Sequence, residues 1–183
     1  MQQTFRPWLQ WIAALAFCTV WRLAPFRPPN VEPVLATMMP FGKRYGAVMS
    51  LLFCAANMVL FDAITGNLSQ WTAVTAVTYA VIGAVAGLIF DQKSGIISYA
   101  LFAVVATLFY DAITGVAAGA ILFGMGWKEG FTGQIPFTIN HLIGNVILAI
   151  VLSPVADWVL VQTSAELSGL RSKNHSTLPT DML

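Results

Sequence analysis

The sequence predicts an all-α membrane protein, built as one bundle of about six transmembrane helices. Apolar residues make up 57% of the 183 residues, and the mean hydropathy is +0.74. Only 9% of the residues are charged, whereas a soluble domain usually has about a quarter. With roughly 20 residues for each span plus its loops, the chain has room for about five or six spans.

The same composition excludes a soluble globular enzyme, a disordered segment and a nucleic-acid-binding protein. Nine basic and eight acidic residues give a net charge of +1. Long apolar stretches separate most of the basic residues, so they form no continuous surface for phosphates, and we expect no nucleic-acid partner. Cys18 and Cys54 lie in apolar runs without metal-ligand spacing and are interpreted as packing residues.

Prolines, glycines and charges set the expected helix boundaries. Four prolines between residues 25 and 33 prevent the first helix from continuing. Gly66 and Gly115 each follow an apolar run, at a position where glycine commonly ends a helix. The expected helices cover about residues 8–24, 31–42, 45–64, 71–90, 96–113 and 135–162.

Three segments need separate interpretation. The first apolar run is expected to be retained, because no small-x-small cleavage site follows it. Residues 116–127 are rich in Gly and Ala and too short to span, which predicts a re-entrant segment or an outer surface helix. One membrane domain is expected over residues 1–162, followed by a polar, flexible, cytoplasmic tail over 163–183.

The distribution of basic residues predicts the orientation. Six spans place both termini on one side of the membrane. Six basic residues fall on that side and three on the other, so the positive-inside rule places both termini in the cytoplasm. We expect a multi-pass protein of the bacterial inner membrane. The basic residues of the terminal side are Arg6, Lys43, Arg44, Lys93, Arg171 and Lys173, and those of the opposite side are Arg22, Arg27 and Lys128.

A six-residue motif occurs twice. Phe61-Asp62-Ala63-Ile64-Thr65-Gly66 returns 49 residues later as Tyr110-Asp111-Ala112-Ile113-Thr114-Gly115. A carboxylate in the last helical turn opposes the helix dipole, and one near the apolar slab is costly. Two interpretations stay open. Asp62 and Asp111 face a common cavity and contribute to a ligand site, or each reaches headgroups and water as the remnant of a duplication.

Other polar residues at membrane depth are further candidates for a binding site. Arg22 follows an apolar helix and either extends its guanidinium to the surface or pairs with Glu32 or an acidic ligand. Asn30 and Glu32 lie in the proline-rich loop, where Asn30 alternatively caps the next helix. Trp71 and Trp127 fall at the outer boundary and either anchor the helices there or stack on a ligand.

The last helix carries the densest polar cluster. His141 and Asn145 are four residues apart and therefore share a face, while Thr138 and Asn140 lie nearby. Gly144 allows a neighbouring helix to approach closely. An ionisable residue inside a membrane is a functional hypothesis by default, although a histidine bonded between helices is an equally ordinary structure.

These features together resemble the substrate-binding S components of energy-coupling factor (ECF) transporters. The resemblance rests on six helices in about 180 residues, a proline-rich outer loop, helix-ending Asp-x-x-x-Gly segments, and the last-helix stretch Phe137-Thr-Ile-Asn-His-Leu-Ile-Gly-Asn145. Residues 22–36 are similar to the opening of an uncharacterised group within that family. The resemblance covers about residues 8–162.

The resemblance implies a fold, a function and partners. An S component captures a vitamin or a related micronutrient from outside, and docks on a transmembrane coupling protein that carries two ATPase subunits. Docking commonly uses small residues on the first helix, and the nearest match here is Ala14-x-x-x-Cys18 with the neighbouring Ala13. Matching positions imply substrate-binding roles for Asn30, Glu32, Asp62, Trp71, Asp111, Trp127, Asn140, His141 and Asn145.

Two other classes of function remain open. The sequence has no HExxH, GxSxG or Walker A motif, so we expect no enzyme activity, no cofactor and no metal site. A structural or assembly subunit of a membrane complex would account for the many Gly and Ala positions. A small intramembrane enzyme would need a contact between His141 and a carboxylate.

Overall fold

The described part of the chain consists of helices joined by loops, without a strand, as the sequence predicts. The computed structural model describes residues 7–28, 30–90 and 95–175, of which residues 7 and 161–175 are described by their backbone alone. The elements are α1 (Pro7–Leu23), α2 (Val34–Thr65), α3 (Gln70–Ile89), α4 (Ile96–Asp111), the π-helix η1 (Ala112–Ala118), α5 (Gly119–Phe123) and α6 (Trp127–His175).

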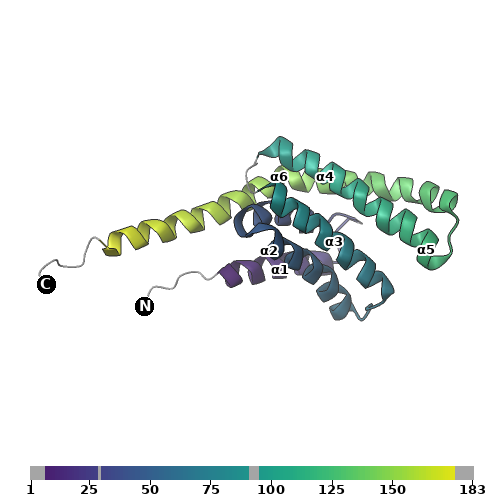
Figure 1. Cartoon of the computed structure of the whole chain (residues 1–183), viewed down its shortest axis with the longest axis horizontal. Coiled ribbons are helices and arrows are strands. Elements are labelled where there is room, and N and C mark those ends of the chain that lie inside the picture. The colour runs from purple at the N-terminus through teal and green to yellow at the C-terminus, as the bar shows by residue number, and fades with distance from the viewer. Residues whose placement is uncertain (1–6, 29, 91–94, 176–183) are drawn as a thin grey trace, which may run out of the picture.

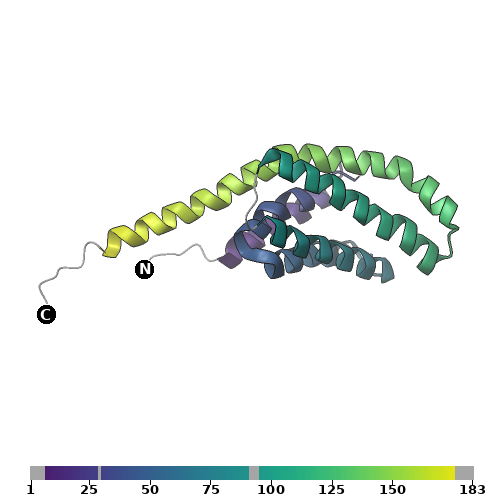
Figure 2. The ribbon, with the colours of Figure 1, turned by 45° about the horizontal axis from the view of Figure 1, so that its top comes forward.

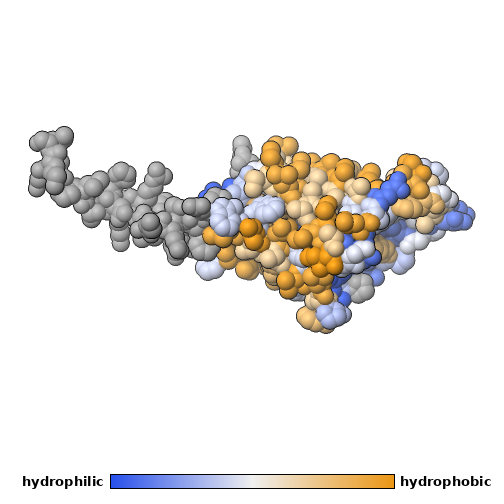
Figure 3. Space-filling view, turned by 90° about the horizontal axis from the view of Figure 1, so that it is seen from below, coloured by the Kyte–Doolittle hydropathy of each residue, from blue (hydrophilic) through white to orange (hydrophobic). Residues whose placement is uncertain are grey.

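Four of the helical segments are long and apolar enough to cross a membrane: Val34–Thr65, Gln70–Ile89, Ile96–Phe123 and Trp127–Leu160. A shorter apolar helix covers Trp8–Leu23. Large apolar side chains are exposed along all of these segments, and Figure 3 shows a broad hydrophobic area over one face of the bundle. A membrane protein is therefore supported, while the number of six spans stays a prediction.

The bundle consists of two layers (Figures 1 and 2). The helices α1, α2 and α3 form one layer, and the continuous segment α4–η1–α5 lies beside α6 in the other. Both views show the start of α1 and the C-terminal part of α6 at the same end of the molecule. Neighbouring segments alternate in direction between this end and the opposite one.

The helix α2 is folded back on itself and contains both helices predicted over 31–42 and 45–64. Gly46 has φ 79° and ψ 178°, a conformation that glycine adopts readily and other residues rarely. The two halves of α2 pack against each other, and the rings of Phe41 and Phe53 are stacked with their centroids 5.1 Å apart. The first half is buried in the middle of the bundle. At about 1.5 Å per residue it is too short to span a bilayer alone.

The prediction that a helix ends at Gly115 is wrong. The chain passes through Gly115 in η1 and continues to Phe123, and Gly124, with φ 67°, ends this helix. A Cβ on Gly115 would lie 1.8 Å from Oε1 of Gln134, so this glycine permits a close approach to α6. Residues 116–123 are therefore neither a re-entrant segment nor a separate surface helix.

The last helix is also longer than predicted. It begins at Trp127 rather than near residue 135, and it ends at His175 rather than near 162. Residues 163–175 of the predicted flexible tail are thus helical, and residues 176–183 lie outside the described part. In Figure 1 this C-terminal portion of α6 extends beyond the bundle.

The contact between α4 and α6 follows a regular pattern. Every fourth residue of each helix is buried, as expected when rows spaced by four residues interlock. These buried residues are Tyr99, Ala103, Thr107 and Asp111 on α4 and His141, Asn145, Ala149 and Ser153 on α6. The polar members at one end of the two rows form the candidate site.

Candidate functional site

A histidine and an aspartate form a buried pair between α4 and α6. Nδ1 of His141 lies 2.8 Å from Oδ1 of Asp111. The two residues are 4% and 2% exposed. Asp111 is the last residue of α4, directly before η1, and His141 faces it because the two helices run antiparallel.

A second polar pair lies one helical turn away. Nδ2 of Asn145 donates a hydrogen bond of 2.8 Å to Oγ1 of Thr107, and both residues are buried. Oδ2 of Asp111 and Oδ1 of Asn145 are buried without a hydrogen-bond partner. An unpaired buried acceptor costs about 1–3 kcal/mol. We call these four residues the histidine cluster. Only some of its buried polar atoms have a hydrogen-bond partner.

Aromatic side chains surround the histidine cluster. The imidazole of His141 packs edge-on against Tyr110 and Phe137, with ring centroids 5.6 and 5.5 Å away. Tyr79 of α3 packs on Tyr110 at 4.7 Å. The small void between these rings and Asn145 leaves no room for a water molecule. The interior part of the cluster is therefore closed in this conformation.

The histidine cluster lies near the middle of two candidate spans. Asp111 is close to the centre of Ile96–Phe123, and His141 is close to the centre of Trp127–Leu160. The sequence had placed Asp111 in the last turn of its helix, and the continuation through η1 accounts for the difference. Ionisable groups at this depth are costly, and they mark substrate or proton pathways in many membrane proteins.

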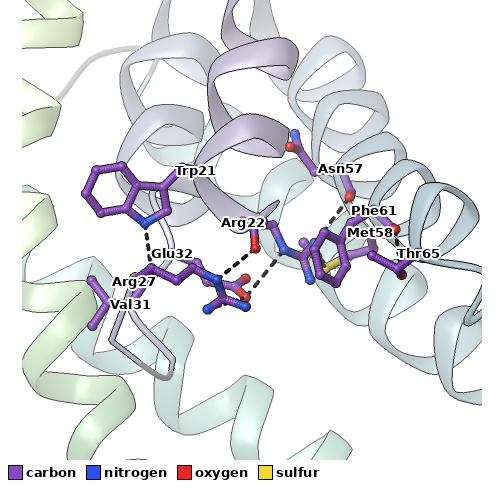
Figure 4. A network of polar contacts seen from close by, with 9 residues as sticks. All are labelled: Trp21, Arg22, Arg27, Val31, Glu32, Asn57, Met58, Phe61 and Thr65. Carbon is purple, nitrogen blue, oxygen red and sulfur yellow. Dashed lines mark hydrogen bonds and ion pairs between the residues drawn. The ribbon is translucent and has the colours of Figure 1, made fainter. Parts of the chain in front are cut away.

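A second cluster ties the loop after α1 to α2 (Figure 4). Nε of Arg22 lies 3.3 Å from Oε1 of Glu32, and Nη1 of Arg27 lies 3.7 Å from the same oxygen. Arg22 also donates to the Asn57 carbonyl at 3.2 Å, and its guanidinium stands 4.1 Å from the centre of the Phe61 ring. The predicted pairing of Arg22 with Glu32 is thus present, in what we call the arginine cluster.

The arginine cluster has a structural role that its contacts explain. Arg22 and Arg27 share one carboxylate, and Nε of Arg27 donates to the Arg22 carbonyl at 2.8 Å, which closes the loop. Trp21 adds a bond from its indole to the Val31 carbonyl at 2.9 Å (Figure 4). No hydrogen bond or ion pair in the described part of the chain joins this cluster to the histidine cluster.

The two copies of the repeated motif differ in structure. Asp62 accepts a hydrogen bond of 2.6 Å from Thr72 at the start of α3, and Gly66 ends α2 with φ 72°. Thr72 also bonds the Ser69 backbone in a capping box. Asp62 therefore links α2 to α3, whereas Asp111 pairs with His141. The structure does not bring the two carboxylates together.

The remaining predicted site residues are dispersed. Asn30 has φ 64° and does not cap α2, which begins after Pro33. Asn140 is exposed and lines a groove with Pro28 and Val31, beside the buried row of α6 rather than in it. The indole of Trp71 packs against Phe123 with the ring centroids 5.6 Å apart.

The small residues of α1 face two ways. Cys18 is fully buried, and its thiol donates to Oγ1 of Thr37 at 3.7 Å. Ala14 is half-buried against the core, while Ala13 is exposed. The side of α1 that carries Ala14 and Cys18 is therefore occupied by α2, and of the three predicted docking residues only Ala13 lies on the surface.

Sequence reasoning missed several polar residues with clear partners. Thr107 was overlooked, although it stands four residues before Asp111, just as Asn145 stands four after His141. Asp157 accepts from Nζ of Lys43 at 2.9 Å and connects α6 to the bend of α2. Oγ of Ser153 donates to the Ala36 carbonyl at 2.8 Å. A charge inside a predicted apolar helix was the available signal for Asp157.

A groove opens beside the histidine cluster, between η1 and the first turns of α6. Its volume is about 420 Å³, within the range of small-molecule sites. Asp111, Gln134 and Thr138 supply its polar lining, and Trp127 and Phe131 its aromatic lining. Trp127, one of the predicted site residues, therefore lines the same groove as Asp111.

Comparison with known proteins does not assign the chain to a family. No protein-family model, no curated protein and no solved structure matches this chain. The functional argument therefore rests on the residues and their geometry.

Proposed function

We propose that the chain is a solute-binding subunit of a membrane transporter, of the type that ECF transporters use as S component. The observation that carries the proposal is the histidine cluster, a partly satisfied polar group at the centre of an apolar helical bundle. Two buried acceptors without partners, on Asp111 and Asn145, would gain hydrogen bonds from a ligand with N–H or O–H groups. A ligand would thus offset a cost that the free protein bears.

In this proposal the protein resides in a bacterial inner membrane with both termini in the cytoplasm. It takes up a vitamin-like micronutrient from the outer side and docks on a coupling protein that carries two ATPases. The described residues supply the binding step, and the partner supplies the energy. Exposed Ala13 and the apolar faces of the bundle are the surfaces available for this docking.

A ligand screen tests the proposal. The purified full chain in detergent is unfolded by heat in the presence of water-soluble vitamins, their precursors, nucleobases and divalent metals. A ligand at 100 times its Kd stabilises the folded state by about 2.7 kcal/mol. Intrinsic tryptophan fluorescence then gives the affinity. If none of these compounds stabilises the folded protein, the result contradicts the proposal and favours a structural subunit.

Matched variants locate the site. Asn145→Ala and His141→Ala should weaken binding at least tenfold, because both side chains belong to the histidine cluster. Asn140→Ala is the control, since Asn140 is exposed on another side of the same helix. Helical content and elution volume show whether each variant is folded. Equal losses in Asn140→Ala and Asn145→Ala would place the site elsewhere.

An intramembrane enzyme is the second candidate, and one observation favours it. The contact that this function requires, between His141 and a carboxylate, is present at 2.8 Å. Incubation of the screened ligands with the chain, followed by mass spectrometry, separates the two functions, because a binding subunit returns its ligand unchanged. The Gly and Ala positions that favour a structural subunit are in part used within the chain, at the contact of Gly83 and Gly87 with α2.

A further inference from the structure

The groove between η1 and α6, which we call the η1 groove, joins the membrane boundary to the middle of the bundle. On α6 it extends from Trp127, the first residue of the helix, to Thr138 and Ile139. At about 1.5 Å per residue this is a length of about 18 Å. The inner end of the groove is therefore at the depth of Asp111.

The π-helix shapes the groove. Ala112, Val116 and Ala117 of η1 line one wall, and their small side chains leave space that larger ones would fill. Single π-helical turns occur frequently at functional sites. Gln134 of the opposite wall lies against Gly115, where any Cβ would overlap its amide group. A polar amide is thus held beside an otherwise apolar channel.

The inner end of the groove carries a carboxylate with one unpaired oxygen. Asp111 is 2% exposed, and its Oδ1 is bonded to His141. Its Oδ2 is buried and has no hydrogen-bond partner. When the imidazole is neutral, the pair bears one negative charge at a depth where charge is costly. An ammonium group supplies both the donor and the opposite charge.

The outer end of the groove is aromatic. Trp127 and Phe131 are 60% and 62% exposed, one helical turn apart on the same side of α6. They provide flat apolar walls for a ring, and Trp is the best partner for a cation that passes over its face. The polar inner end and the aromatic outer end together define an elongated ligand with a cationic head.

We propose that the η1 groove binds an elongated aromatic amine, whose ammonium group reaches Asp111 and whose ring, at the other end of a flexible chain, packs against Trp127 and Phe131. The inference rests on the proposed function and names its substrate class. Oδ2 of Asp111 is buried in this conformation, so the side chains that cover it must move before the ammonium group can reach it. A membrane lipid is the competing occupant, but about 420 Å³ suits one small molecule better than a two-chain phospholipid.

Binding of 6-phenylhexylamine is the test, because its six-carbon chain separates the ammonium group from the ring, with 6-phenylhexan-1-ol as the neutral analogue of the same shape. Both are titrated against the full chain in phosphatidylcholine nanodiscs, with tryptophan fluorescence as readout. We expect the amine to bind at least tenfold more tightly than the alcohol, since hydrogen bonds to charged groups are the stronger ones. Trp127→Phe should remove most of the fluorescence change, although the chain has six tryptophans.

Three variants connect the binding to the groove. Asp111→Asn keeps the shape of the side chain and should abolish the preference for the amine over the alcohol. Because Asp111 is buried, Ala112→Phe serves as a second variant that fills the groove from an exposed position. It should weaken amine binding at least tenfold and leave the protein folded. Ala73→Phe, at an exposed alanine of α3, is the matched control and should bind normally.

The outcomes separate this inference from the proposed function. Equal binding of amine and alcohol, or unchanged binding in Ala112→Phe, overturns the inference. So does stabilisation by phosphatidylethanolamine in the nanodisc without any effect of the free amine. Binding of a vitamin-like ligand that depends on His141, without any binding of 6-phenylhexylamine, overturns the inference and leaves the proposed function intact. Amine binding that needs Asp111, without amine uptake into proteoliposomes in the presence of the coupling partner, supports the site and contradicts transport.

Discussion

At the residue scale, a single buried hydrogen bond joins the two helices of the histidine cluster. Thr107→Val removes the hydroxyl that accepts from Asn145 and leaves the Asn145 amide without a partner. We expect a loss of about 1 kcal/mol in the free energy of unfolding, as for other hydrogen bonds between membrane helices. Reversible unfolding in mixed micelles measures it.

The control is Thr132→Val. Thr132 is exposed, and its hydroxyl bonds only to carbonyls of its own helix, with the Lys128 oxygen 2.9 Å away. Its replacement should change the stability by less than about 0.5 kcal/mol. Equal effects of the two substitutions would show that the bond between the helices adds nothing.

A charge pair gives the second prediction at this scale. Glu32→Gln removes the carboxylate that faces both Arg22 and Arg27, and Arg22 is then left largely buried without a counter-charge. Breaking a fully buried pair costs about 3–5 kcal/mol, and because these side chains retain some exposure we expect about 1–3 kcal/mol. Thermal unfolding of the purified chain measures the loss.

Glu129→Gln is the matched control, because Glu129 is exposed in the first turn of α6. It should leave the melting temperature nearly unchanged. An unchanged melting temperature for Glu32→Gln as well would mean that the Asn57 carbonyl and the Phe61 ring alone satisfy Arg22.

The sequence identified most residues of the two clusters, though not Thr107, and it predicted the partner in only one of them. The pairing of Arg22 with Glu32 was one of its alternatives, since only ten residues separate them. The partner of His141 could not be chosen between two aspartates, because the choice depends on the register of two helices about thirty residues apart. That register is set by the interlocking rows of α4 and α6, and no local pattern encodes it.

At the element scale, two glycines of α3 determine how closely it approaches α2. A Cβ on Gly87 would lie 2.4 Å from the Cα of Ala47, and one on Gly83 would lie 2.7 Å from the Ser50 carbonyl oxygen. Gly87→Ala must therefore move one backbone away from the other. We expect a loss of about 1–3 kcal/mol, as for other overpacked interiors, measured by unfolding in mixed micelles.

Gly133→Ala is the opposite case in the same measurement. Gly133 lies inside α6, and a Cβ there would meet no atom within 4 Å. Since alanine favours a helix by about 1 kcal/mol over glycine, this variant should be neutral or more stable. A loss of stability in Gly133→Ala comparable to that in Gly87→Ala would contradict the packing argument.

The sequence located most helices well, but it misplaced the helix end at Gly115 and both ends of the last helix. The breaks near Gly46 and Gly66, and the one between the end of α3 at Ile89 and the start of α4 at Ile96, follow from local signals that glycines and charges supply. Gly115 also follows an apolar run, as a helix-ending glycine does. Its role is different, because it makes room for the side chain of Gln134. Glycine serves both purposes in membrane helices, so the sequence alone does not distinguish a helix end from a packing position.

At the scale of the whole molecule, the fold makes the membrane topology testable. The bend of α2, the start of α4 and the C-terminal part of α6 lie at the end of the bundle where α1 begins (Figure 1). The turns after α2 and after α5 lie at the other end. Both termini are predicted to be cytoplasmic, so these two turns should face the periplasm.

Single cysteines measure this topology. In a Cys18→Ala, Cys54→Ala background, Asn67→Cys and Met125→Cys should react with an impermeant maleimide in intact cells, because both positions are exposed. In the same background, a cysteine is introduced by Asp157→Cys together with Lys43→Gln, which removes the lysine that would lose its partner. This double variant should react with the maleimide only after the membrane is permeabilised. A green fluorescent protein fused after Leu183 should fluoresce. Labelling of residue 157 in intact cells would show that the orientation is the opposite of the predicted one.

The sequence predicted the class of the whole molecule better than its internal arrangement. Composition alone indicates a helical membrane protein, because few charges and long apolar runs leave few alternatives. The sequence predicted the two halves of α2 as separate helices and not as one helix folded back on itself. The short first half is stabilised by burial on all sides rather than by lipid. Burial of this kind depends on the helices that surround it.

The repeated hexapeptide behaves as a chameleon sequence. Phe61-Asp62-Ala63-Ile64-Thr65-Gly66 stops a helix, whereas Tyr110-Asp111-Ala112-Ile113-Thr114-Gly115 widens one and lets it continue. Both threonines even bond to the carbonyl four residues earlier, at 2.9 and 2.8 Å. A role established for one aspartate therefore does not transfer to the other by similarity. The difference between the copies lies in what they contact: the second copy faces Gln134 at Gly115 and His141 at Asp111, and the first faces Thr72 at Asp62.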